Sequence, residues 1–265
     1  MDSQPRFAVH HSFDPQSPRP AMFFLHGMLA SRQHWALNLP ALSRIVQPVC
    51  LELWGHGDSP APADDACYEM SAIQAQIEAV RESLALPRLF ICGHSFSAGI
   101  VLRYAIEHAD RVQGLVFLNS LSALAPNTLF TNNPQRQERI ESVATLGAEA
   151  FRRMTFHPRN ARRLPEEVRE VLIREADRVS PEGFVKLNTI TGPQLTVLDD
   201  LPRLKTPSLL VNGRFEKRFQ PMREIAAKQI PGCQVVDLDA GHAVNIEQSE
   251  PFDIAVTEFV NKLLD

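Results

Sequence analysis

Cysteine is scarce in this 265-residue chain. Cys50, Cys67, Cys92 and Cys233 are the four present, and no two of them form a C-x-x-C pair. Cys50 and Cys92 lie inside short apolar runs, where a free thiol behaves as a small hydrophobic side chain. This usage argues against a disulfide scaffold and favours a reducing compartment.

Long apolar runs are also missing. No run approaches the roughly 18–20 residues needed to span a bilayer. The first twenty residues, MDSQPRFAVHHSFDPQSPRP, have neither the basic start nor the continuous apolar stretch of a signal peptide. We therefore expect a cytoplasmic protein with no membrane partner.

The chain has no excess of positive charge. It carries 27 lysines and arginines against 31 acidic residues, a net charge of −4, which gives no reason to expect a nucleic-acid partner. Its nine histidines include no H-E-x-x-H spacing. We expect no metal and no other cofactor, and a monomer or a homodimer.

Short apolar segments that alternate with helical patterns are present instead, in a sequence that is 44% hydrophobic. The segments that predict strands are 21–25, 48–53, 88–92, 112–119, 208–212 and 234–238. Helical spacing is found at 34–44, 72–86, 96–108, 221–229 and 250–264. This alternation predicts an α/β fold with a mostly parallel sheet flanked by helices.

The stretch 121–205 breaks this alternation, because its pattern is almost wholly helical, at 135–146, 149–155, 165–178 and 181–190. We interpret it as a helical cap inserted into a core made of residues 1–120 and 206–265. Its 13 basic residues are nearly balanced by 11 acidic ones, which favours solvated helix faces. An anion site at Arg162 and Arg163 is the alternative.

Glycine, histidine and serine gather where the predicted strands end. The chain reads His26-Gly27-Met28 after the first strand, GHGDS at 55–59 after the second and GHSFSAG at 93–99 after the third. It reads GRFE at 213–216 and GHAVNIEQSEPF at 241–252 after the last two. A serine, an acid and a histidine, in that order and each just after a strand, resemble the α/β-hydrolase superfamily, from Phe7 to Leu264.

The resemblance implies a catalytic triad. Ser95 would be the nucleophile on the sharp turn called the nucleophile elbow, and His242 the base that activates it. Glu216 would orient the imidazole, a departure from the family's usual Asp. Asn119 leaves no carboxylate at the competing position after the fourth strand.

The resemblance also implies an oxyanion hole made by the backbone N–H groups of Met28 and Phe96. Ser97 stands where the elbow usually has glycine. We expect the elbow to survive this change with some shift of the helix packing. His56 is expected to fix a loop by hydrogen bonds, and His94 to line the helix side of the elbow.

A largely apolar pocket is expected to receive the substrate. The residues predicted to bind it are His26, Gly27, Trp35, Met154, Phe156 and Phe215, with Phe130 and Phe184 as further apolar candidates. The aromatic and methionine side chains among them can equally be core residues.

The family resemblance predicts hydrolysis of a carboxylic ester, thioester or lactone through an acyl-enzyme. The chain is also similar to the menaquinone-pathway synthases, which use the same triad as a base to expel pyruvate. Those synthases carry an arginine four residues after the nucleophile, where this chain has Gly99. Elimination is therefore one alternative, and a non-catalytic small-molecule receptor on the same fold is the other.

Overall fold

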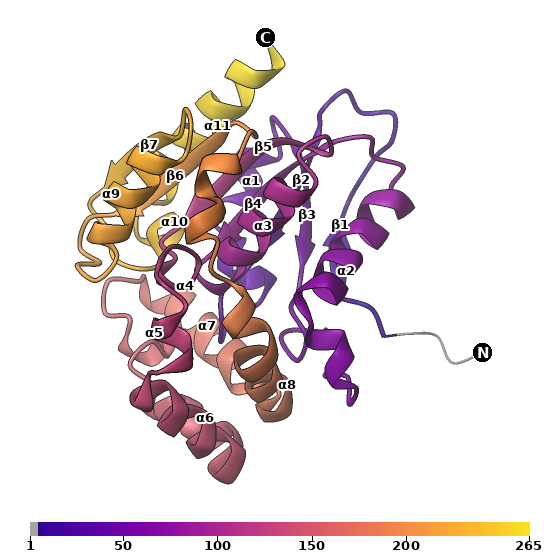
Figure 1. Ribbon diagram of the computed structural model, residues 1–265. Coiled ribbons are helices and arrows are strands. Elements are labelled where there is room, and N and C mark those ends of the chain that lie inside the picture. The colour runs from indigo at the N-terminus through magenta and orange to yellow at the C-terminus, as the bar shows by residue number, and fades with distance from the viewer. Residues whose placement is uncertain (1–4) are drawn as a thin grey trace.

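The protein is built around one mostly parallel sheet, shown in Figure 1, in a computed structural model that describes residues 5–265. Within these residues the strands form a seven-stranded sheet in the order β1-β3-β2-β4-β5-β6-β7. The strands are β1 (Val9–His11), β2 (Ala21–Leu25), β3 (Gln47–Leu51), β4 (Leu89–His94), β5 (Val112–Leu118), β6 (Ser208–Gly213) and β7 (Gln234–Leu238). All neighbours pair in parallel except β1, which runs antiparallel to β3. The predicted α/β-hydrolase fold class is thus confirmed, with β1 as an additional edge strand.

Side chains of the central strands alternate between two hydrophobic layers. Phe23 packs into the layer that contains α2 and α3, whereas Phe24, the next residue, packs into the layer that contains α11. This alternation follows from the period of two in a strand. Both faces of the sheet are covered, so the chemistry is left to the strand ends.

The α-helices are α1 (Leu39–Leu42), α2 (Met70–Ser83), α3 (Phe96–Glu107), α4 (Leu121–Leu124), α5 (Thr128–Thr131), α6 (Pro134–Leu146), α7 (Glu166–Asp177), α8 (Pro181–Lys186), α9 (Gln220–Gln229), α10 (Val244–Glu247) and α11 (Ser249–Leu264). Shorter 3₁₀ or π turns are η1 (Arg32–Trp35), η2 (Asp65–Tyr68), η3 (Gly147–Arg153), η4 (Pro158–Asn160), η5 (Leu187–Thr191), η6 (Gly192–Gln194) and η7 (Leu198–Arg203). The helix predicted over 34–44 is therefore two short pieces, η1 and α1, and the one predicted over 149–155 is the 3₁₀ turn η3.

The helices between β5 and β6 gather at one end of the molecule, where α5 to α8 lie together at the lower left of Figure 1. Part of this segment has its own small hydrophobic cluster, which includes Phe151, Met154 and Phe184. Residues near the end of the segment, such as Leu195 and Leu201, belong instead to the main core cluster, which also contains residues of α2 and α3. We call residues 121–186 the roof.

Among residues 5–265, none of the helices combines the length and the apolar character that crossing a membrane requires.

Candidate active site

Ser95 stands on a strained turn between β4 and α3. Its backbone has φ 54° and ψ −114°, a conformation that non-glycine residues rarely adopt. The turn leaves no room at Gly93, where an added Cβ would lie 2.6 Å from Cγ2 of Val101. The Ser95 N–H donates to the carbonyl of Leu118 on β5, at 3.1 Å, and so anchors the turn to the neighbouring strand. This is the geometry expected of a nucleophile elbow.

Ser97 replaces the usual glycine of this turn and is fully buried. Its hydroxyl donates a hydrogen bond to the carbonyl of His26, at the end of β2. The larger residue is therefore accommodated by a polar contact, which joins α3 to the segment after β2.

His242 and Glu216 meet beside Ser95, although 26 positions separate them in the chain. The Nδ1 atom of His242 lies 2.9 Å from Oε2 of Glu216. The two competing acids are engaged elsewhere, because Asp237 pairs with Arg223 at 2.7 Å and Asp239 lies 2.8 Å from Arg214. Glu216 is thus the carboxylate placed to orient this imidazole.

The loops that carry Glu216 and His242 are tied together by Asn119, which follows β5 and is fully buried. Its Oδ1 accepts from the N–H of Gly213 at 3.1 Å, and its Nδ2 donates to the carbonyl of Gly241 at 3.0 Å. The position that could have held a triad carboxylate therefore holds an asparagine that links the two loops by hydrogen bonds. Sequence reasoning missed this role, because an asparagine after a strand has no distinctive pattern.

The pKa of His242 reflects two opposing influences. The partly buried position of the ring disfavours its protonated form, and the carboxylates of Glu216, first, and Glu247 outweigh this, so the pKa of His242 lies above its ordinary value. Among the described residues no hydrogen bond joins the Ser95 hydroxyl to His242, although both line one cavity. Such contacts often tighten only when substrate binds.

Two further histidines support His242. The Nε2 of His94 donates to the backbone carbonyl of His242 at 2.9 Å, and the His94 ring stacks on that of His34 with centroids 4.3 Å apart. Burial lowers the pKa of both, to about 3 for His34, so both rings are neutral. His94 therefore holds the His242 loop rather than taking part as a base.

His26 is a buried anchor of the loop that follows β2. Its Nδ1 donates to the carbonyl of Gly27 at 2.7 Å, and its Nε2 accepts from the N–H of Leu53 at 3.3 Å. Burial lowers its pKa to about 4, which keeps the ring neutral.

His56 fixes the adjacent loop by hydrogen bonds, as predicted. Its Nδ1 donates to the carbonyl of Trp54 at 3.0 Å, and its Nε2 accepts from the N–H of Leu29 at 3.3 Å. Burial lowers its pKa to about 3.

Met28 and Phe96 both border the cavity next to Ser95. Phe96 is the first residue of α3, so its N–H has no partner within the helix. The N–H of Met28 finds no acceptor within residues 5–265. Gly27 brings the two segments together, because a Cβ added there would lie 3.1 Å from Cβ of Ser95. Two N–H groups without a partner among the described residues therefore border the cavity that Ser95 lines.

A cavity of about 800 Å³ opens in front of Ser95. The sheet side is formed by residues that follow strands, and the roof supplies Arg139, Phe156 and Leu172. The volume lies in the range of sites that enclose a drug-sized molecule.

Several residues predicted to line this cavity do not. Trp35 is fully buried against Phe24 in the core, His26 is the anchor described above, and Met154 packs inside the roof. Phe215 is 47% exposed and stacks under Arg163 outside the lining, with the guanidinium carbon 4.6 Å from the ring centroid.

Gly27 and Phe156 do border the cavity. Phe184 belongs to the roof cluster, and the side chain of Phe130 lies outside the described part of the chain. Large apolar side chains serve core and pocket alike, which is why the sequence could not separate them.

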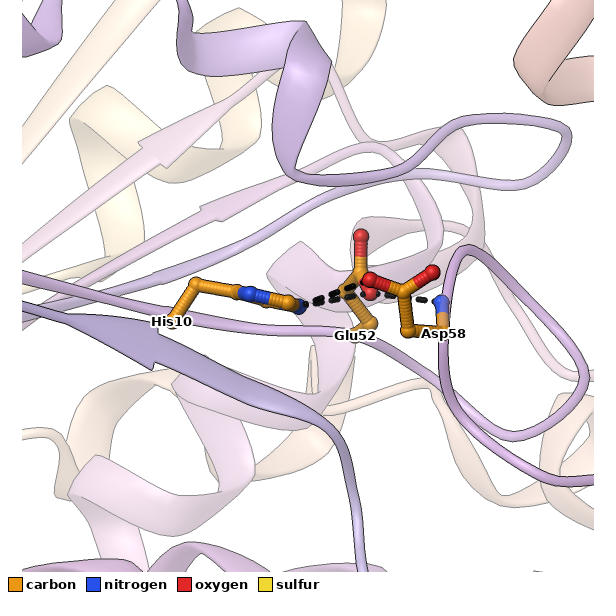
Figure 2. Close-up of side chains that lie close together, drawn as sticks. All are labelled: His10, Glu52 and Asp58. Atoms are coloured by element: carbon orange, nitrogen blue, oxygen red, sulfur yellow. Dashed lines mark hydrogen bonds and ion pairs between the residues drawn. The ribbon is translucent and has the colours of Figure 1, made fainter.

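Away from this cavity, His10, Glu52 and Asp58 converge near the edge strand, as Figure 2 shows. The spacing of their ligand atoms would suit a metal ion. However, Nη1 of Arg32 lies 2.8 Å from Nε2 of His10 and 2.7 Å from Oδ2 of Asp58. A guanidinium already supplies the positive charge, so this group is a structural ion cluster that joins β1 to the loop after β3.

The family comparison agrees with this geometry. The alpha/beta hydrolase fold family matches residues 20–249, and the chain belongs to this family. A protein of Bacillus subtilis (strain 168) named "Putative 2-succinyl-6-hydroxy-2,4-cyclohexadiene-1-carboxylate synthase" is 25% identical over 260 residues, which cover 92% of this chain and 91% of that protein.

Solved structures share the fold. The enol-lactonase from Burkholderia xenovorans LB400 superposes with a TM-score of 0.81 at 20% identity and covers 96% of both chains. MenH from S. aureus gives a TM-score of 0.85 at 17% identity, over 98% of this chain and 99% of the other. At this level of identity they bear on the fold alone.

Proposed function

We propose that this protein is a serine hydrolase that cleaves a carboxylic ester, thioester or lactone through Ser95, His242 and Glu216. The observation that carries the proposal is the contact of 2.9 Å between His242 and Glu216, on the cavity wall that also presents Ser95 from a strained elbow. A Pseudomonas savastanoi relative named "Putative carbamate hydrolase RutD", 25% identical over 253 residues, is consistent with it.

The reaction would begin with attack of Ser95 Oγ on the substrate carbonyl carbon, while Nε2 of His242 takes the hydroxyl proton. The carboxylate of Glu216 would hold the ring in the required tautomer and stabilise its protonated form. The N–H groups of Met28 and Phe96 would donate to the oxyanion. His242 would then return the proton to the leaving group, and water would release the acyl group from Ser95 by the same steps.

The inserted helices would act as a cap over this site. Their position between β5 and β6, and the roof residues on the cavity wall, support a core of residues 1–120 and 206–265 with a cap at 121–205. Leu195 and Leu201 pack into the main core, so substitutions there would disturb the core itself. The part of the cap that could change in sequence without disturbing the core would therefore end near residue 187.

Elimination of pyruvate is the second candidate, favoured by the similarity to the Bacillus subtilis protein. The residue at the position of the synthases' arginine, Gly99, argues against this reaction. At Gly99 an added Cβ would lie 2.8 Å from the carbonyl oxygen of Leu195, so the backbone here leaves no space for an arginine side chain. A coupled assay for pyruvate release, run beside a 4-nitrophenyl ester assay, separates the two reactions.

The decisive test is labelling with a fluorophosphonate probe, which reacts with activated serines. Wild-type protein should be labelled, and Ser95→Ala should lose both labelling and ester turnover. By analogy with other triads the loss of turnover is about 10⁶-fold. Ser122→Ala is the matched control, because Ser122 also lines the cavity. Labelling that persists in Ser95→Ala would move the nucleophile elsewhere, and an unlabelled wild-type protein would favour a receptor.

A further inference from the structure

Four arginines line the cavity: Arg139, Arg162, Arg163 and Arg218. Among residues 5–265, no ion pair joins any of these four to an acidic side chain. Other arginines of the same inserted helices are paired, for example Arg153 with Glu149 at 2.6 Å and Arg152 with Asp177 at 2.7 Å. The cavity thus brings together four arginines that have no acidic partner within the described residues.

The two acids among the described residues of the cavity form no ion pair with these arginines. Glu216 is engaged by His242. Glu247 accepts a hydrogen bond of 2.7 Å from the backbone N–H of Gly241 and keeps its charge, which offsets part of that of Arg163, because a Cβ added at Gly241 would lie 2.9 Å from the Glu247 Oε1 and 3.3 Å from the Arg163 Nη1. The positive charge of Arg139 and Arg218 therefore remains available to a ligand.

Arg139 and Arg218 line the cavity from two different segments. Arg139 belongs to α6 in the roof and is half-buried, whereas Arg218 lies in the loop that carries Glu216 and is exposed. Burial lowers the pKa of Arg139, and the charge of Arg218 lowers it further. An anion bound between the two side chains would offset this repulsion.

The rest of the roof side mixes apolar residues with polar ones such as Thr155 and Asn160. Leu164 and Leu172 lie on the cavity wall, and the Arg139 guanidinium carbon lies 5.7 Å from the centroid of the Phe156 ring. The apolar part of this wall suits a ligand with an apolar segment beside its negative charge.

We propose that the substrate carries a carboxylate, bound by Arg139 and Arg218, with Arg162 and Arg163 adding to the positive field. This inference rests on the proposed hydrolase function and names its substrate class: an acyl compound with an apolar chain that ends in an anion. Arginine is suited to this task because its planar fork can bind a carboxylate through two parallel hydrogen bonds.

The test compares matched esters. Mono-4-nitrophenyl adipate carries a carboxylate on the acyl side, 4-nitrophenyl hexanoate is its neutral counterpart, and 4-butyryloxybenzoate places the charge on the leaving group. Wild-type protein should prefer a charged ester, and the preferred one tells which side of the scissile bond faces the arginines. In the double variant Arg139→Gln, Arg218→Gln, the preference should fall about 10–100-fold, mainly through KM.

Arg153→Gln is the matched control, because it removes the same charge from the roof outside the cavity lining. It should leave the preference unchanged. Raising the salt concentration should also raise KM for the charged ester more than for the neutral one. Equal kcat/KM for charged and neutral esters, or a double variant with an unchanged preference, would overturn the inference.

Binding separates this inference from the proposed function. Ser95→Ala should bind adipate in a calorimeter, and binding should be lost when Arg139→Gln and Arg218→Gln are added. If no ester is hydrolysed but adipate binds in this way, the function fails and the anion site stands. If neutral esters are hydrolysed and adipate does not bind, the anion site fails and the function stands.

Discussion

The two walls of the cavity are built in different ways. On the sheet side, hydrogen bonds between neighbouring strand ends, such as those of Asn119 and His94, hold the loops in place. On the roof side, Arg139 lies in α6 and Phe156 in the turn between η3 and η4, and the roof has a small cluster of its own and exposed ion pairs such as Arg153 with Glu149. Exposed pairs contribute little to stability. The sheet side is suited to fixing the chemistry, and the roof to adjusting which substrate enters.

A change at Glu216 should produce the largest effect, because it acts on the sheet side. Glu216→Gln keeps the size of the side chain but removes the charge that stabilises protonated His242, so kcat should fall by up to about 10⁴-fold. This charge raises the pKa of His242, so without it the acid limb of the pH–rate profile should move to lower pH.

Asp239→Asn is the control for Glu216→Gln, because Asp239 pairs with Arg214 and not with His242. Glu216→Asp should be milder than Glu216→Gln. A profile that stays in place in Glu216→Gln, together with full activity, would assign the acid to another residue.

Asn119→Ala should have an intermediate effect. It leaves the N–H of Gly213 and the carbonyl of Gly241 unpaired in the interior, which should cost about 2 kcal/mol of stability. Because these groups hold the loops of Glu216 and His242, kcat should also fall about 10–100-fold with KM little changed.

The two effects of Asn119→Ala are measured by thermal unfolding and by steady-state kinetics below the unfolding range. Asn119→Asp keeps the acceptor for Gly213 but sets a buried carboxylate oxygen against the carbonyl of Gly241, and should lower the Tm at least as much as Asn119→Ala. A lower Tm with unchanged kcat would mean that Asn119 serves stability alone.

A change in the roof should have the smallest effect and a different character. Phe156→Ala should alter the order of kcat/KM among 4-nitrophenyl acetate, hexanoate and decanoate by about tenfold, with little change for acetate. Leu146→Ala is the matched control, since Leu146 is a similarly exposed apolar residue of the inserted helices outside the lining. A uniform loss for all three esters would place Phe156 in the chemistry and erase the difference between the two walls.

The succession of the main strands along the chain, and the placement of Ser95, Glu216 and His242 around one cavity, could be predicted from sequence, because parallel strands bring their carboxyl ends together. The edge strand β1 could not. It has three half-buried or exposed residues and pairs with a strand some forty positions away. Its partner was chosen by tertiary contacts rather than by a local pattern.

The cavity lining was the least predictable part of the site. Trp35 and Phe156 have the same chemical character, yet one fills the core and the other borders the cavity. The cavity arginines were predicted only in part, since Arg162 and Arg163 were considered as an anion site but Arg139 and Arg218 were not. The numbers of basic and acidic residues in 121–205 are nearly equal, and such totals do not tell which arginines lack an acidic neighbour in the folded chain.

Leu29 links the two walls and limits how freely they can be recombined. Its side chain belongs to the roof cluster with Phe151 and Phe184, while its own N–H is bound by His56 and its backbone has φ 54°. It directly follows Met28. A chimera that carries the roof of another hydrolase on this sheet would therefore need an apolar site into which the Leu29 side chain packs. Without such a site, the exchange would displace the backbone at Met28 as well as change the substrate pocket.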